Sequence, residues 1–422
     1  MKIALQSSPK RFGQRSVDPQ QTIAHLESLL LPRFDYSMYE EQVGPNLYWA
    51  VLYIDDLTFR AMGKGTTPEA SKAGALAEAA EWLLCRDVDA VDGYVYAHPD
   101  ALSPDEALQF EDLLPHVVTA TPPVIEQIRD LDVSRHWVPG WSLQDNRQKL
   151  IPIEYINVIS GPNGQAAGNT LEEAVEHAAL EVFERRAQIA VLRNKMVVPT
   201  IDPASIEDKQ VQSLLAWIKS KGIEVVLKDL SFGGALPCVG AYFVDPEVPD
   251  TYQFHHFFKV GAAFSTVEAL TRTCTEFVQG RMQHEFLRDG NIDLQKLLEP
   301  DFRELRSPVG ACDNFLSAFM FGFAVWRDAS FLYEGEVIPI QHSDGYADSL
   351  EDIQAAQDVC ASLQKEMFVI DLTNADYGFH VARVVVPSYS DVLPFHPSNS
   401  PGLFRKLTRS EVLAEPAYHE KG

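Results

Sequence analysis

Two features of the sequence predict a mixed α/β (α+β) fold: strand-like and helix-like segments alternate along the chain, and three of the helices share one pattern of polar residues. Strands are expected where Val, Ile and aromatic residues are concentrated, and helices where apolar residues recur at helical spacing. The expected strands cover 47–54, 151–159, 223–228, 238–244, 367–372 and 380–386, and the expected helices cover 68–85, 171–192, 208–220, 266–287 and 349–364. No low-complexity segment divides the 422 residues, so we expect one continuous globular unit.

Each of the three related helices starts at a hydroxyl residue that suits an N-cap. Such a hydroxyl accepts a hydrogen bond from a backbone amide of the first helical turn. A proline at the first helical position or a capping-box glutamate supports each start. The caps are Thr67 (with Pro68), Thr170 (with Glu173) and Ser265 (with Glu268), and glycine-containing turns are expected before them at 63–65, 161–168 and 261.

Counted from its cap, each of these helices carries polar residues in the same register. Position 11 is a carboxylate in all three, position 14 is a carboxylate or an amide, and position 7 varies. These positions have the i, i+4, i+7 spacing of a single helical face. In chain order the residues at positions 7, 11 and 14 are Gly74, Glu78 and Glu81; His177, Glu181 and Glu184; and Arg272, Glu276 and Gln279.

An acidic helical face has two interpretations, a solvated surface and a functional site. Isolated acidic pairs at this spacing are common on exposed helices. Here, however, alanines and other apolar residues flank the pairs, and buried carboxylates require a cation or hydrogen-bond donors. Five carboxylates and an amide carbonyl from three helices would suit Mg²⁺, which prefers hard oxygen ligands alongside substrate phosphates.

Arginines accompany the acids on the same helices. Arg185 follows Glu184, and Arg272 and Arg281 bracket the third acidic position. They can form structural ion pairs with these carboxylates or bind phosphate oxygens, for which a guanidinium group is well shaped. Acids and arginines together favour a metal-bridged nucleoside triphosphate, although the sequence contains neither a Walker A loop nor a dinucleotide-binding glycine motif.

The overall charge limits the partners. Sixty Asp and Glu against 35 Lys and Arg give a net charge of −25, which argues against nucleic-acid binding and implies that an anionic ligand is accompanied by a metal ion. The N-terminus lacks the apolar stretch of a signal peptide, and the longest apolar run, 315–326, is too short for a membrane span and is interpreted as core. Five cysteines without CxxC pairs favour reduced thiols and a cytoplasmic location.

Three ordered segments resemble the ATP-binding helices of the YcaO superfamily: GKGTTPEASKAGALAEAAEWL, NGQAAGNTLEEAVEHAALEVFERR and ALTRTCTEFVQGR. The resemblance extends to ARVVVPSYSDVLP near the end and is strongest to the branch of ribosomal protein methylthiotransferase accessory factors. It implies a YcaO domain over 61–390, with an N-terminal segment, 1–60, packed on the core and a C-terminal tail, 391–422.

The resemblance also implies ATP and Mg²⁺ as ligands. Mg²⁺ would be held by Glu78, Glu81, Glu181, Glu184 and Glu276, and the residues at the ATP and its phosphates would be Lys10, Thr22, Gly74, Arg185, Arg272, Gln279 and Arg281. The family's reaction is ATP-dependent activation of a backbone amide, which yields an azoline or a thioamide in a peptide or ribosomal protein. A sulfur-delivery protein or a methylthiotransferase is the partner expected from this resemblance, and a homodimer stays open as the assembly.

The first motif departs from the family pattern SxxxExxER at two positions. Gly74 stands at the serine position of the phosphate-binding face and Trp82 at the arginine position. The proline-rich PxPxP end of the peptide-cyclising members is also lacking. These departures keep a second hypothesis open, a non-catalytic accessory factor that binds nucleotide and assists a methylthiotransferase.

Overall fold

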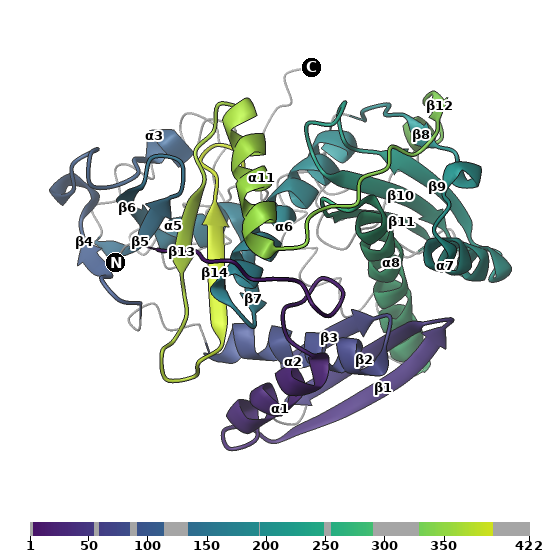
Figure 1. The fold of residues 1–422 in the computed structure, drawn as a ribbon, viewed down its shortest axis with the longest axis horizontal. Coiled ribbons are helices and arrows are strands. Elements are labelled where there is room, and N and C mark those ends of the chain that lie inside the picture. The colour runs from purple at the N-terminus through teal and green to yellow at the C-terminus, as the bar shows by residue number, and fades with distance from the viewer. Residues whose placement is uncertain are drawn as a thin grey trace, which may run out of the picture.

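The computed structural model describes residues 3–54, 59–84, 91–113, 134–193, 195–248, 255–289 and 329–390. The strands of this part of the chain form three sheets, and helices pack against and between them (Figure 1). The mixed α/β fold expected from the sequence is confirmed. The apolar run 315–326, Cys85, Cys312 and the tail 391–422 lie outside the described residues.

The first sheet is an antiparallel meander of β1 (Tyr36–Gly44), β2 (Leu47–Ile54) and β3 (Phe59–Gly65). The second has the order β11-β10-β9-β8-β12, and only its β8–β12 pair is parallel. The third has the order β4-β5-β13-β14-β7, with β6 paired to β5. The bounds in the second and third sheets are β8 Thr200–Ile201, β9 Glu224–Asp229, β10 Cys238–Val244, β11 His256–Ala262, β12 Val337–Ile338, β4 Val95–Ala97, β5 Arg135–Ser142, β6 Arg147–Pro152, β7 Gln165–Gly168, β13 Phe368–Asp371 and β14 His380–Val385.

The five expected helices are present within two residues of their expected ends. They are α2 (Pro68–Leu84), α6 (Leu171–Arg193), α7 (Lys209–Ser220), α8 (Thr266–Asp289) and α11 (Ser349–Ser362), and the structure adds α1 (Pro19–Leu30), α3 (Phe110–Leu113) and α5 (Ile153–Ser160). Within the described residues, none of the helices combines the length and the apolar character that a membrane span requires.

The strand expected over 151–159 is wrong beyond its first two residues. Strand β6 ends at Pro152, and α5 follows directly and ends before Gly161, which has a positive φ of 57°. Ile153, Ile156 and Ser160 are buried at helical spacing, so packing of one helical face outweighs the strand preference of the Ile and Val residues.

The three related helices belong to a repeated strand-turn-helix unit, β3–α2, β7–α6 and β11–α8. The N-cap predictions are confirmed, since the hydroxyls of Thr67, Thr170 and Ser265 each accept a hydrogen bond from the amide three residues on, at 3.1, 3.2 and 3.4 Å. The capping box at Thr170 does not close as expected. The Glu173 carboxylate accepts instead from the backbone N–H of Asn169, at 3.0 Å.

The glycines before the caps lie mostly in strands, not in turns as expected, and they let each helix approach the strand that precedes it. A Cβ atom at Gly63 would lie 1.9 Å from Ser71 O, and one at Gly261 would lie 2.4 Å from Ala269 O. Any side chain there would push the helix outward. The glycines therefore set the close strand–helix packing that the unit repeats.

Apolar cores lie on both sides of the central helix α6 and under α1 and α2. Helix α6 lies between the second and third sheets (Figure 1). Its Phe183 and Val182 side chains are buried in the core there. In the first unit, Leu26 of α1 shares a core with Leu76 of α2. The expected boundary between residues 60 and 61 falls inside β3, which pairs with β2. The N-terminal segment thus contributes to the same sheet and core as α2.

Candidate functional site

The acidic faces of α2, α6 and α8 meet at one place. Burial and the neighbouring carboxylates of Glu181 and Glu78 raise the pKa of Glu81 to about 8. Burial also raises the pKa of Glu78, with a smaller contribution from the charge of Glu276 on α8. Carboxylates shift one another in this way only when they are close and poorly solvated. The acidic faces that the sequence places in matched register on three helices therefore lie close together in the fold.

Two of these carboxylates are held by the strand segment of their own unit. The backbone N–H of Met62 donates to Glu78 Oε2 at 2.7 Å, and that of Gly164 donates to Glu181 Oε2 at 2.8 Å. Gln165 Nε2 donates to Glu81 Oε1 at 3.3 Å. Each of these hydrogen bonds uses one oxygen of its carboxylate. The bonds therefore orient the acids, and the second oxygen of each carboxylate does not take part in them.

Cations surround the acids without forming tight pairs with most of them. Arg185 lies 3.6 Å from both Glu181 and Glu184, and Arg272 lies 3.7 Å from Glu184. These separations are longer than a strong charge-assisted hydrogen bond. The guanidinium groups therefore neutralise the acids while keeping donors for another anion.

Glu276 is the exception, because Lys64 pairs with it directly. Burial alone would raise the pKa of Glu276, but the charges of Lys64 and Lys259 outweigh it and hold this pKa below its ordinary value. Lys64 lies in the segment 63–65, where the sequence predicts only a glycine-containing turn. Its place on β3, beside α8, depends on the packing of two units that are some 200 residues apart.

The site accommodates a metal ion only in part. Among the described side chains, no group of three or more His, Cys, Asp or Glu residues is arranged to hold a metal, so the cage expected from the sequence is not preformed. Within the described part of the chain, the buried oxygen Glu184 Oε2 accepts no hydrogen bond and has only Arg272 at 3.7 Å, and Glu81 has a strongly raised pKa. Since Mg²⁺ commonly uses one or two carboxylates together with substrate phosphates, these residues fit a nucleotide-bound ion.

The remaining predicted residues divide into those near the acids and those turned away. Gly74 packs on β3, where an added Cβ would lie 3.4 Å from Gly63 Cα, so a serine would contact that strand. Gln279 is half-buried on α8. Arg281 binds Asp245 at 2.8 Å and Glu247 at 2.6 Å. Five residues beyond Glu276, it lies about 140° around the helix, and the structure does not bring it to the acids.

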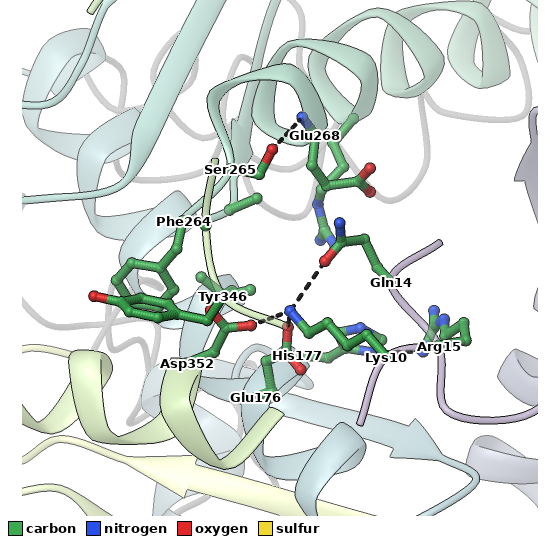
Figure 2. A pocket seen from close by; sticks show the side chains of 14 residues that line it. Lys10, Gln14, Arg15, Glu176, His177, Phe264, Ser265, Glu268, Tyr346 and Asp352 are labelled. Atoms are coloured by element: carbon green, nitrogen blue, oxygen red, sulfur yellow. Dashed lines mark hydrogen bonds and ion pairs between the residues drawn. The ribbon is translucent and has the colours of Figure 1, made fainter. Parts of the chain in front are cut away.

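A small pocket of about 50 Å³ adjoins the acidic cluster, by which we mean Glu78, Glu81, Glu181, Glu184 and Glu276. The pocket is lined mainly by charged and polar side chains (Figure 2). Lys10 projects into it from the N-terminal segment and binds Glu176 at 2.9 Å, Gln14 at 3.0 Å and Asp352. Thr22 lies elsewhere, where its hydroxyl donates to Asn169 at 2.7 Å and joins α1 to the start of α6. The sequence placed Lys10 at a nucleotide site, and the structure places it on the wall of this pocket.

Arg15 and His177 also line the pocket and lie next to Lys10 (Figure 2). Arg15 lies 2.8 Å from His177 Nδ1, and because a guanidinium can only donate, that nitrogen accepts. Burial, with the charges of Arg15 and Arg272, keeps the pKa of His177 well below its ordinary value, so the imidazole is neutral. Phe264 and Tyr346 add an aromatic wall, with ring centroids 5.8 Å apart and Tyr346 46% exposed.

The buried ion pairs of Lys10 with Glu176 and Asp352 should make the stability of the protein depend on pH. Burial and the neighbouring Glu176 raise the pKa of Asp352 to about 7, against an ordinary value of 3.8. The folded protein thus binds more protons than the unfolded chain between these values, and stability falls as the pH rises from about 4 to about 7, by at most about 4 kcal/mol. In urea unfolding at several pH values, Asp352→Asn should flatten this fall.

The exposed Asp376 provides the control. Asp376→Asn should leave the pH dependence of the wild type unchanged. An Asp352→Asn protein whose stability fell as steeply as that of the wild type over this range would contradict the assignment.

A family model described as YcaO cyclodehydratase, ATP- and Mg²⁺-binding, matches residues 62–390. An uncharacterised protein of Haemophilus influenzae is 25% identical over 361 residues, 79% of this chain and 57% of that protein. The ribosomal protein S12 methylthiotransferase accessory factor YcaO of Escherichia coli is 25% identical over 265 residues, 61% of this chain and 41% of that protein. The chain thus spans about half the length of these two relatives.

Solved structures share the fold. A heterocyclase in complex with substrate and cofactor has a TM-score of 0.66 at 21% identity, over 92% of this chain and 54% of that one. YcaO from Methanopyrus kandleri bound with AMPPCP and Mg²⁺ has a TM-score of 0.60 at 17% identity, over 89% of this chain and 92% of that one. Since the family model accounts for most of the chain and the fold agrees with it, this protein belongs to the YcaO family, whose domain binds ATP and Mg²⁺.

Proposed function

We propose that this protein is an ATP- and Mg²⁺-dependent enzyme that activates a peptide backbone amide by phosphorylation and forms a thioamide or an azoline. The observation that carries the proposal is the meeting of three acidic helical faces with Arg185 and Arg272 beside a pocket that both acidic and basic side chains line. Phosphoryl transfer depends chiefly on positioning and charge neutralisation, and these residues supply both.

In this proposal the nucleotide extends from the pocket to the acids. Lys10 and Arg15 lie on the pocket wall with the aromatic pair Phe264 and Tyr346, which presents an exposed ring to a base. Arg272 lines the pocket and also lies near Glu184, so it links the two regions. The proposed metal-binding residues are Glu78, Glu81, Glu181, Glu184 and Glu276, and the proposed phosphate contacts are Arg185, Arg272 and Gln279.

The reaction of the family indicates what each of these side chains would do. A Cys, Ser or Thr side chain, or external sulfide, adds to the amide carbonyl, and the resulting oxyanion attacks the γ-phosphate of ATP. The carbonyl oxygen then leaves as phosphate. Bound Mg²⁺ supplies neutralisation of the phosphate charge. Arg185 and Arg272 hold donors toward the transferring group, and the buried side chain of Glu184 leaves little room for water beside Arg185.

The alternative function is a non-catalytic accessory factor that binds nucleotide and assists a ribosomal protein methylthiotransferase. Gly74 favours it, because no hydroxyl is available at this position of the phosphate-binding face. The Escherichia coli relative bears such an accessory-factor name. Both functions share the ATP and Mg²⁺ site and differ in whether ATP is consumed.

Phosphate release separates the two functions. The protein is incubated with Mg-ATP and either ribosomal protein S12 or synthetic peptides that contain Cys, Ser and Thr, with and without sulfide. The enzyme predicts phosphate release in step with a peptide that has lost one water or exchanged oxygen for sulfur, read by mass spectrometry. Nucleotide binding without phosphate release, together with stimulation of a purified methylthiotransferase, would support the accessory factor instead.

A further inference from the structure

Lys259 is a cation of the acidic cluster that the family motifs do not include. It lies on β11, the edge strand of the second sheet. Its neighbours of the same parity face α8: the Phe257 ring lies 5.2 Å from that of Phe277, and Gly261 is in contact with the α8 backbone. Because side chains alternate along a strand, Lys259 extends from the same face, between these two residues.

The strand face directs Lys259 toward α8, and the acids within electrostatic range of its ammonium group are Glu276 and Glu184. Burial lowers its pKa to about 8, opposed mainly by the charge of Glu276, and Arg185 and Lys64 act on it as well. Yet among the described residues no side chain pairs with Lys259 within ion-pair distance, whereas Lys64, Arg185 and Arg272 each have a carboxylate. A half-buried ammonium group with donors to spare is suited to an anionic ligand.

The geometry of β11 and α8 fixes where along the nucleotide Lys259 lies. Ala263 and Glu268 line the pocket at the turn between the two elements. Lys259 is four strand residues from Ala263, about 13 Å, and Glu276 is eight helical residues from Glu268, about 12 Å. Lys259 and Glu276 therefore lie at about the same distance from the pocket, beyond Arg272.

We propose that Lys259 contacts the terminal phosphate of the nucleotide when the base and sugar lie at the pocket against the exposed ring of Tyr346, since a pocket of about 50 Å³ is too small to enclose them. The inference rests on the proposed nucleotide site and deepens it, since it gives the bound nucleotide a direction along α8. It also distinguishes Lys259 from Lys10, whose contacts lie at the pocket end.

Calorimetric titration with Mg-ATP and with AMP tests the contact. Lys259→Met should weaken ATP binding about 10- to 100-fold, the loss of a hydrogen bond to a charged group, and leave AMP binding within about twofold. Lys259→Arg should retain most of the affinity for ATP. Lys219→Met removes the same charge from the exposed end of α7 and should change neither affinity.

Each outcome bears on a different claim. Equal losses for ATP and AMP, or no loss for ATP, would overturn the assignment of Lys259. A wild-type protein that binds neither ligand would instead contradict the nucleotide site itself. Circular dichroism checks the fold of each variant, and if Lys259→Met does not fold, Lys259→Gln is titrated in its place, with the same outcomes required.

Discussion

Glu181→Ala is expected to weaken Mg²⁺-dependent ATP binding by at least about 100-fold. Glu181 belongs to the central acidic face, where its carboxylate is oriented by the N–H of Gly164 and lies 3.6 Å from Arg185. Even residues that only orient metal ligands cost 10- to 100-fold in metal affinity when they are removed, and a ligand should cost at least as much. Titration calorimetry with ATP, with and without Mg²⁺, measures the effect.

Glu181→Ala should lower the affinity for Mg-ATP without lowering the stability of the protein. Because burial raises the pKa of Glu181, removal of the carboxylate should not destabilise the protein without ligand. The control is Glu351→Ala in the exposed first turn of α11, which removes the same charge far from the acidic faces along the chain. Unchanged Mg-ATP binding in Glu181→Ala, or equal losses in both variants, would remove the acidic faces from the proposed site.

Arg383→Met is expected to lower the free energy of unfolding by about 3–5 kcal/mol. Arg383 is 1% exposed on β14, donates to Asn157 and to the carbonyl of Gly161, and lies near Glu181 and Glu81. Breaking a buried charged network from one side leaves polar groups without compensation, which is among the costliest single changes. Urea unfolding without ligand measures the loss.

Arg147, an exposed arginine, provides the control for the effect of burial on the loss of stability. Arg147 pairs with Glu366 at 2.8 Å at the surface, and Arg147→Met should cost no more than about 1 kcal/mol. Similar losses in the two variants would show that Arg383 is not essential to the packing beneath the acidic cluster.

Local patterns were the reliable part of the sequence prediction. The caps at Thr67, Thr170 and Ser265 are real because a hydroxyl and the amide three residues on meet within one turn. The segment 151–159 failed because its short apolar run suits either element, and only contacts with neighbouring segments select the helix. Arg281 was grouped with the acids by its motif, whereas its direction around α8 leads it to Asp245.

Residue spacing on a single helix follows from backbone geometry. The sequence by itself therefore determined the three acidic faces, their N-caps and their matched register. Which residues contact these faces depends on the packing of segments that are far apart in the chain. Such packing leaves no periodic pattern in the sequence. Lys10 binds Asp352 across more than 300 residues, and Lys64 reaches Glu276 across more than 200. Lys64, Lys259 and Arg383 contribute to the charge balance of the acidic cluster, and Lys10 and Arg15 to that of the pocket. Only the tertiary structure brings these cations to their places.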